Sequence, residues 1–173
     1  MVTDAVRHIV AGVVLIFAGC AMATKSANTI KATGTGHSDE RRIVKTTAYT
    51  SSDSRRAASG AKSALGSELQ SGEISSAAAD WSRFPIGTKF RVVETSKTYV
   101  VDDYGPALVG TDTIDLYVPS RRIMNQWGVR RVTIQVVEKG SYAESLQVLE
   151  SRRSNSCCRQ MARNIQKQIA NTY

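Results

Sequence analysis

Histidine is scarce in this 173-residue chain, which has only two, His8 and His37. Both lie ahead of the segment that we expect to fold, so the folded part can assemble neither a Ser/His/Asp triad nor a histidine-based metal site. The glycines also lack the G-x-G-x-x-G spacing of a phosphate-binding loop. The sequence therefore excludes triad hydrolysis, and we expect no metal and no cofactor.

Cysteine is equally scarce, with three residues in all: Cys20, Cys157 and Cys158. Neighbouring cysteines rarely form a relaxed disulfide with each other, because the geometry is strained. Cys157 and Cys158 also lack the spacing of zinc ligands. We therefore expect these two to serve in packing or in intermolecular pairing.

A long apolar run is missing as well. The longest one covers residues 9–19, well short of the ~20 residues that a membrane-spanning helix needs. Its length fits a signal peptide over residues 1–19. Phe17-Ala18-Gly19-Cys20 is similar to a bacterial lipobox, so we expect Cys20 to be lipidated; the alternative is a plain signal peptide cut near Ala21 or Ala23. A lipidated chain would be exported and anchored by Cys20, and Ala21 would favour the outer membrane, facing the periplasm.

The rest of the chain divides by composition into three parts. Residues 20–44 are rich in Ala, Thr, Ser, Gly and Lys, as is typical of a flexible tether. Residues 45–138 form the predicted domain. Residues 139–173 carry six Lys or Arg and two Glu within a chain of net charge +8. This basic tail suits an anionic surface, whereas an export signal disfavours nucleic acid as a partner; a solvated face without any partner is the alternative.

Short β-type segments dominate the predicted domain and indicate a sandwich or a barrel. We expect strands over residues 43–49, 89–93, 98–101, 113–118 and 131–137. A short helix should begin after Ser120 and end at Gly128. Tight turns are predicted at Gly87 and Gly105. The tail has helical spacing of apolar residues on both sides of a break at 152–156, and its helices either pack on the barrel or contact the wall or the membrane.

Three aspartates are flanked by small, apolar or aromatic residues: Asp80, Asp103 and Asp115. A carboxylate among such neighbours is costly to desolvate, which favours a functional role. If Ile114 and Leu116 face the core, strand alternation turns Asp115 to the other face. From this strand alone, an ordinary outward-facing aspartate that is hydrogen-bonded to a neighbouring loop is the better explanation.

Four short sequence motifs together favour a specific interpretation. They are Asp80 with Pro85 and Gly87; Asp103-Tyr104-Gly105 with Gly110; Ile114-Asp115-Leu116-Tyr117; and Trp127-Gly128-Val129-Arg130-Arg131-Val132. In this order they resemble the bacterial three-aspartate (3D) domain, and Tyr49-Thr50 resembles its leading motif. The sequence departs from the pattern at Trp81 and in an extra residue after Gly110. Asp102 leaves a one-residue ambiguity beside Asp103, and the spacing to Gly105 favours Asp103.

The resemblance implies a fold, a substrate and a site. The fold is a mostly β, six-stranded double-psi β-barrel with a short internal helix and a C-terminal helical tail. The 3D domain occurs in wall-remodelling proteins and is related to the core of one class of lytic transglycosylases, so peptidoglycan glycan strands are the expected partner. The implied catalytic residues are Asp115, with Asp103 and Asp80, and the implied substrate-binding residues are Tyr49, Thr50, Tyr104 and Tyr117. Burial beside a like charge would raise the pKa of Asp115 and keep it protonated. The alternative is a non-catalytic wall-binding or wall-loosening module, and the oligomeric state is left open.

Overall fold

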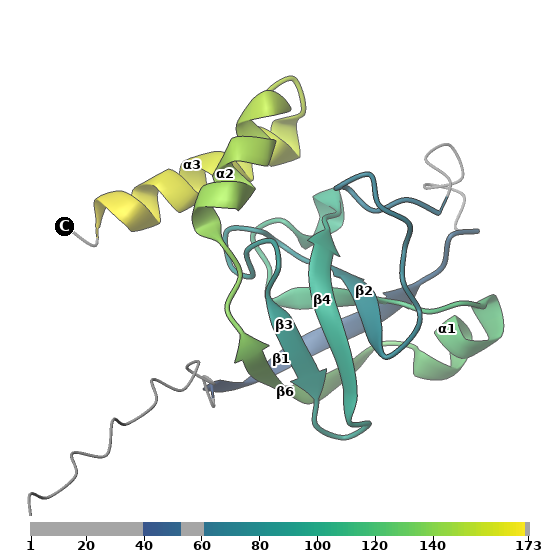
Figure 1. The fold of residues 1–173 in the computed structure, drawn as a ribbon. Coiled ribbons are helices and arrows are strands. Elements are labelled where there is room, and N and C mark those ends of the chain that lie inside the picture. The colour runs from purple at the N-terminus through teal and green to yellow at the C-terminus, as the bar shows by residue number, and fades with distance from the viewer. Residues whose placement is uncertain (1–39, 53–60, 172–173) are drawn as a thin grey trace, which may run out of the picture. The chain divides into compact units, whose positions relative to one another are not determined.

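The computed structural model describes residues 40–52 and 61–171, which contain six strands, three α-helices and one short 3-10 helix (Figure 1). The signal peptide, Cys20 and most of the expected tether lie outside the described residues. The strands are β1 (Glu40–Tyr49), β2 (Ile74–Ala78), β3 (Lys89–Val92), β4 (Lys97–Asp103), β5 (Thr113–Tyr117) and β6 (Arg130–Glu138). The helices are η1 (Pro106–Leu108), α1 (Arg121–Trp127), α2 (Tyr142–Ser151) and α3 (Ser156–Ala170).

The six strands close into a barrel in the order β1-β5-β2-β4-β3-β6. Two neighbouring pairs, β1 with β5 and β2 with β4, run parallel, and the other pairs run antiparallel. Parallel neighbours need crossover connections, so strands far apart in the sequence become adjacent. The predicted fold class, a mostly β chain with a six-stranded barrel, a short internal helix and a helical tail, is confirmed.

The barrel starts earlier than the sequence analysis placed it. Strand β1 begins at Glu40 and pairs with β6 from that residue onward, so residues 40–44 belong to the barrel and not to the tether. Val44 and Thr46 in this strand are buried, while their neighbours on the other face are exposed. Pairing with β6 extends the strand into a segment whose composition alone resembled a linker.

Side chains that alternate toward the inner face of each strand fill the barrel interior. Ile114 and Leu116 of β5 are fully buried, together with Phe90, Val101 and Ile134 of neighbouring strands. Burying an aliphatic or aromatic side chain of this size contributes roughly 1.5–3 kcal/mol. Because these residues fix which face of β5 is the inner one, they also determine the direction in which Asp115 points.

The internal helix and one of two predicted tight turns agree with the sequence. The Ser120 side chain accepts a hydrogen bond from the Ile123 N–H at the start of α1, and Gly128 ends the helix with φ +61°. Gly87 has φ +82°, as a tight turn requires. The expectation for Gly105 was wrong, because its φ of −138° is extended backbone at the start of η1.

Helices α2 and α3 form a hairpin that packs on one end of the barrel (Figure 1). Leu149, Cys158, Met161 and Ile165 are fully buried in the same cluster as the barrel core. The Trp81 N–H donates to the Met161 sulfur at 3.4 Å. The packing alternative for the tail is therefore the one that the structure shows, and the adjacent cysteines lie within this contact.

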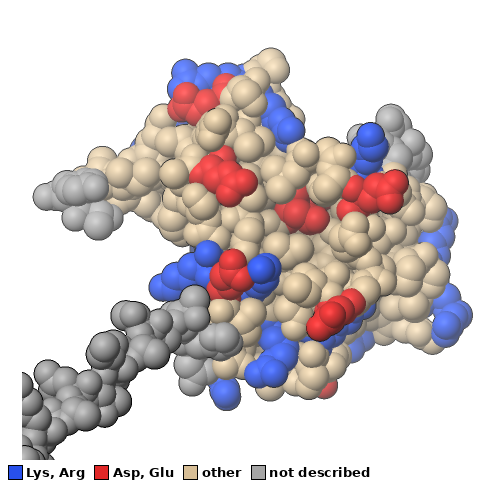
Figure 2. All heavy atoms as spheres, in the orientation of Figure 1, with Lys and Arg blue, Asp and Glu red and all other residues tan. Residues whose placement is uncertain are grey.

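The charged residues are interspersed on the surface. Figure 2 shows acidic and basic side chains on both the barrel and the helical hairpin of one face. Basic residues of the hairpin include Arg153, which pairs with Glu150 at 2.8 Å. Among the described residues, no helix combines the length and the apolar character that a membrane crossing requires.

Candidate active site

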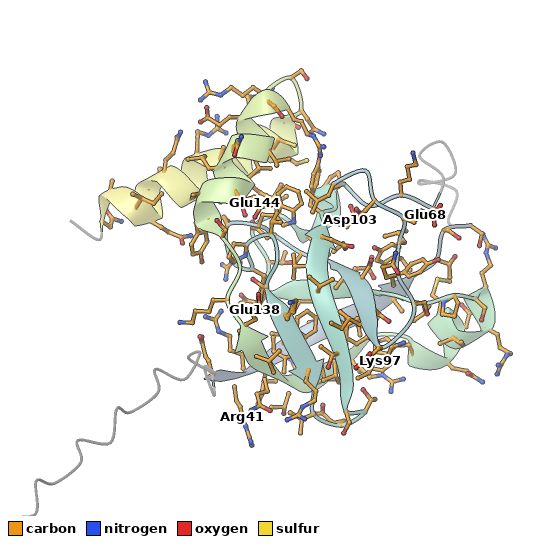
Figure 3. All side chains as sticks on the ribbon, viewed as in Figure 1. Arg41, Glu68, Lys97, Asp103, Glu138 and Glu144 are labelled. Atoms are coloured by element: carbon orange, nitrogen blue, oxygen red, sulfur yellow. The ribbon has the colours of Figure 1, made fainter. Side chains whose placement is uncertain are left out.

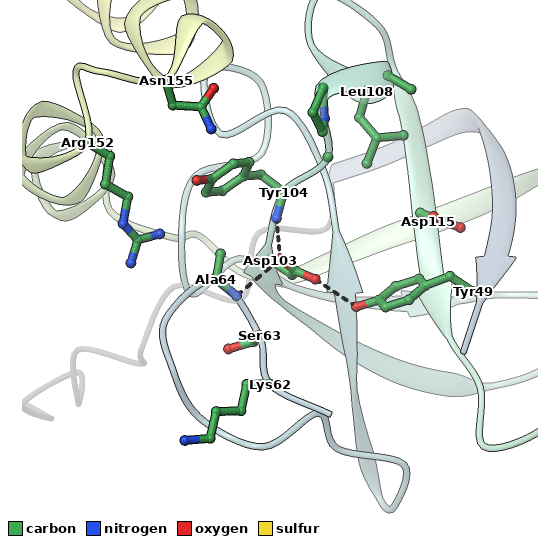
Figure 4. Close-up of a pocket in the computed structure, with 13 residues that line it drawn as sticks. Tyr49, Lys62, Ser63, Ala64, Asp103, Tyr104, Leu108, Asp115, Arg152 and Asn155 are labelled. Carbon is green, nitrogen blue, oxygen red and sulfur yellow. Dashed lines mark hydrogen bonds between the residues drawn. The ribbon is translucent and has the colours of Figure 1, made fainter. Parts of the chain in front are cut away.

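A pocket of about 730 Å³ lies where the end of the barrel meets the helical hairpin (Figure 4). Strands, loops and hairpin all contribute to its lining: Tyr49, Lys62, Ser63, Ala64, Asp103, Tyr104, Gly105, Pro106, Ala107, Leu108, Asp115, Arg152 and Asn155. A pocket of this volume is within the range of sites that enclose small ligands. Two of the three predicted catalytic aspartates line it.

Asp103 ends β4, on the side of the barrel that faces the helices (Figure 3). Its Oδ1 accepts hydrogen bonds from the backbone N–H groups of Tyr104, at 2.8 Å, and Ala64, at 3.1 Å. Its Oδ2 accepts from the Tyr49 hydroxyl at 3.2 Å. Donors from three segments therefore hold this buried carboxylate in one orientation against the pocket.

Asp115 lies in the middle of β5, on the face opposite Ile114 and Leu116, as strand alternation predicted. It is half-buried and pairs in register with Thr47 of β1. The Thr47 hydroxyl donates to Asp115 Oδ1 at 2.8 Å. This bond orients the carboxyl group, and its partial exposure leaves it accessible from the pocket.

The structure separates Asp102 from Asp103. Strands β2 and β4 shift register between Ala77 and Ala78, and Asp102 lies at this irregularity. Its Oδ2 accepts from the Ser76 hydroxyl at 2.6 Å, and its buried Oδ1 has no hydrogen-bond partner among residues 40–52 and 61–171. Burial raises the pKa of Asp102 to about 6, and the neighbouring charge of Asp103 acts in the same direction against the lowering effect of Ser76. Asp103 lines the pocket and Asp102 does not, so the one-residue ambiguity is resolved in favour of Asp103.

Asp80 does not line the pocket. It is fully buried, and its Oδ1 accepts from the backbone N–H of Ser82 at 2.8 Å and from the Ser82 hydroxyl at 2.7 Å. Its Oδ2 accepts from the backbone N–H of Gly110 at 2.6 Å. Asp80 thus ties its own turn to the loop that leads into β5, an arrangement that positions the strand carrying Asp115.

The four predicted substrate-binding residues are divided between the pocket and its support. Tyr49 and Tyr104 line the pocket, whereas Thr50 and Tyr117 are buried outside its lining. The rings of Tyr49 and Tyr117 lie 5.5 Å apart, and Thr50 shares a hydrogen bond with Ser52 at 2.9 Å. Tyr49 therefore packs on Tyr117 and holds Asp103, and its predicted contact with a sugar stays a prediction.

Sequence reasoning missed two parts of the lining. One is the loop containing Lys62, Ser63 and Ala64, which the Leu69 N–H closes by donating to the Ala61 carbonyl and which the Ala64 N–H joins to the barrel by donating to Asp103. The other is the α2–α3 connection, which contributes Arg152 and Asn155. Its sequence indicated only a helix break, and a contact between the tail and the mouth of the barrel has no local signature.

A family model matches the part of the chain that carries this geometry. Residues 75–138 match the model described as the 3D domain. The resemblance to the 3D domain that the sequence suggested is confirmed over these residues. The match begins after β1, so the 3D domain as matched contains β2 to β6, and β1 supplies the remaining strand of the barrel. No curated protein matches the chain.

Only a few kinds of side chain in this pocket could take part in a reaction. Two aspartates, two tyrosines and two basic residues, Lys62 and Arg152, line one hollow. Within residues 40–52 and 61–171, no three His, Cys, Asp or Glu side chains are grouped so as to hold a metal ion. A role in peptidoglycan metabolism fits the 3D family and this set of acids, because carboxyl groups are the residues that cleave glycosidic bonds in most glycan-processing enzymes.

Proposed function

We propose that this protein is a peptidoglycan lytic transglycosylase that cleaves the bond between N-acetylmuramic acid and N-acetylglucosamine and leaves 1,6-anhydro ends. The observation that carries the proposal is the convergence of Asp115 and Asp103 on one pocket within a 3D domain. The two acids differ in setting: Asp103 is buried, whereas Asp115 is half-buried.

Asp115 is the proton donor in this proposal, because it is the more accessible of the two acids. Its carboxyl group gives a proton to the glycosidic oxygen while the bond from that oxygen to the anomeric carbon of the muramic acid breaks. The positive charge on the anomeric carbon is stabilised by the carboxylate of Asp103. The sugar's own 6-hydroxyl oxygen then bonds to the anomeric carbon, and its proton returns to Asp115. No water is consumed, and the enzyme ends in its starting protonation state.

The surrounding residues position these two acids. Thr47 orients Asp115 with a hydrogen bond of 2.8 Å, and Tyr49 and two backbone N–H groups orient Asp103. A positioned general acid contributes typically ~10²–10⁴-fold in rate. The phenol rings of Tyr49 and Tyr104 offer flat surfaces on which a sugar ring can lie.

Purified sacculi test this reaction. The full chain and an Asp115→Asn variant are incubated with sacculi, and the soluble muropeptides are analysed by mass spectrometry. We expect anhydro ends from the wild type and none from the variant, with Asp112→Asn as a matched control, because Asp112 is an exposed aspartate that pairs with Arg83 outside the pocket. Reducing ends in place of anhydro ends would identify a hydrolase. Binding to sacculi without any soluble product would indicate a wall-binding module, and undiminished release by Asp115→Asn would refute the assignment of the acid.

The location that we propose for this reaction rests on the first twenty residues. An eleven-residue apolar run directly before Cys20 supports export and lipid anchoring at that cysteine, and Ala21 supports the outer membrane. Growth with radiolabelled palmitate tests this proposal, since label on the wild type and none on Cys20→Ser is the expected result. Label on neither would leave a cleaved, unanchored protein.

A further inference from the structure

We propose that Arg152, which lies outside the matched 3D domain, binds a carboxylate group of the glycan substrate and so makes the pocket selective for acidic glycans. This inference rests on the proposed function and assigns the substrate contact to the helical hairpin. It concerns the part of the pocket lining that comes from neither the barrel nor its loops.

Arg152 is held in place by the hairpin. It follows α2 directly, its backbone N–H donates to the Leu149 carbonyl at 3.1 Å, and its carbonyl accepts from the Asn155 N–H at 2.9 Å. Leu149 and Met161 fasten the two helices in the core. The backbone of Arg152 is therefore set by packed elements, and its side chain interacts with Tyr104, so that part of the entropy cost of using it in binding is already met.

The charge of Arg152 is available to a ligand. In the described part of the chain, no carboxylate lies within ion-pair distance of Arg152, whereas the adjacent Arg153 pairs with Glu150 at 2.8 Å. Tyr104 is a titratable neighbour that interacts with Arg152 both electrostatically and through a side-chain hydrogen bond. Burial and the Cys158 thiol raise the pKa of Tyr104 to about 12, so its phenol is neutral at physiological pH and does not cancel the charge of Arg152.

The placement of Arg152 complements the acids of the pocket. Asp103 and Asp115 lie toward the barrel, and Arg152 and Asn155 reach toward Tyr104 and Ala64 from the hairpin (Figure 4). Two carboxylates alone would repel an acidic glycan. A cation on the opposite wall lets the reacting bond lie at the acids while an acidic substituent lies at the arginine.

Carboxylate is the substituent that this geometry fits in peptidoglycan. The planar guanidinium of arginine matches a carboxylate with two parallel hydrogen bonds. Peptidoglycan offers this group from two sources: the lactyl carboxylate of muramic acid where the peptide has been removed, and the carboxylates of the stem peptide where it is present.

Three glycan preparations distinguish these sources. The first is strands freed of peptide by an amidase, the second is the same strands after reduction of the lactyl carboxyl group to an alcohol, and the third is peptide-bearing strands. Binding of each is measured by calorimetry with the full chain carrying Asp115→Asn, so that the glycan is not cleaved. The same chain is then compared with Arg152→Gln, Arg152→Lys and Arg153→Gln added.

We expect Arg152→Gln to weaken binding of a carboxylate-bearing glycan about tenfold, the low end of the effect of a hydrogen bond to a charged group, because the site is partly exposed. Binding of the reduced strands should change by less than about twofold on the same physical grounds. Arg152→Lys should restore part of the affinity, and Arg153→Gln should leave it unchanged, because Arg153 is outside the pocket. The preparation that shows the loss identifies the source of the carboxylate.

The outcomes separate the two proposals. If Arg152→Gln weakens all three glycans equally, or none of them, the inference about Arg152 is overturned while glycan binding stands. If the Asp115→Asn parent binds none of the three preparations, the proposed function fails as well. Thermal unfolding of each variant shows that the compared proteins are equally folded.

Discussion

Asp80 gives the sharpest test of how the three aspartates divide their work. The sequence resemblance implies a catalytic role, whereas the geometry gives Asp80 three internal donors: Ser82 N–H, Ser82 hydroxyl and Gly110 N–H. The change to make is Asp80→Asn, which keeps the shape but replaces one acceptor oxygen with an NH₂ group. Because every contact of the carboxylate is with a donor, the new NH₂ must face an N–H or O–H group.

The magnitude follows from the bonds that are lost. A hydrogen bond to a charged group contributes about 1.5–3 kcal/mol, and a buried donor left without a partner costs about 1–3 kcal/mol. Since these effects overlap at one site, we expect Asp80→Asn to lower the free energy of unfolding by roughly 3 kcal/mol. For a chain of this length, 1 kcal/mol corresponds to about 2–4 °C in Tm, so the expected fall is about 6–12 °C.

Urea and thermal unfolding followed by circular dichroism measure this change. The control is Asp112→Asn, because the Asp112 side chain is 62% exposed and its pairing with Arg83 is a surface ion pair. Such a pair contributes about 0–1 kcal/mol. Release of anhydro muropeptides is then assayed well below the Tm of Asp80→Asn, where we expect it to persist. Wild-type stability together with abolished turnover would refute the positioning role and make Asp80 a chemical participant.

Two further predictions concern groups away from the pocket. Gly140→Ala should lower the free energy of unfolding by about 3 kcal/mol, because the added methyl group would overlap the carbonyl oxygens of Pro85 and Ile86; an unchanged urea midpoint would contradict the close packing there. Asp102 has a pKa raised to about 6 in the folded protein against ~3.9 in the unfolded chain, so its neutral form stabilises the fold below about pH 4 and this contribution is lost as the pH rises through 6. The stability of Asp102→Asn relative to the wild type should therefore increase from pH 4 to pH 7 in urea unfolding curves, and a constant difference would show that Asp102 is ionised throughout.

Strand patterns predicted most of the barrel but not β2. The alternating segments at β3, β4, β5 and β6 were recognisable because one face of each is apolar. Strand β2 has the sequence Ile-Ser-Ser-Ala-Ala, its last four residues are buried, and it lies between β4 and β5. Small residues have weak strand propensity, and burial on both faces removes the alternation that reveals a strand. Its pairing is a property of the closed barrel and not of the local sequence.

The site was predictable where a local rule applied. Alternation gave the direction of Asp115, and the spacing to Gly105 selected Asp103 over Asp102. No local rule could show that Asp80 faces Ser82 and Gly110, because the Gly110 bond joins loops thirty residues apart. The same holds for Arg152, whose place in the pocket depends on the packing of Met161 and Ile165 against the barrel. Long-range packing decides which members of a motif reach the pocket and which support it.

The first strand has a consequence for how the chain is made. Strand β1 is held between β5 and β6, so one of its edges has no partner until β5 (Thr113–Tyr117) has been synthesised, and the other has none until β6 (Arg130–Glu138) follows. Pairings this distant in sequence slow the search for the native state. The barrel accordingly stays open for most of the chain's synthesis, which suits the export that we propose for this protein.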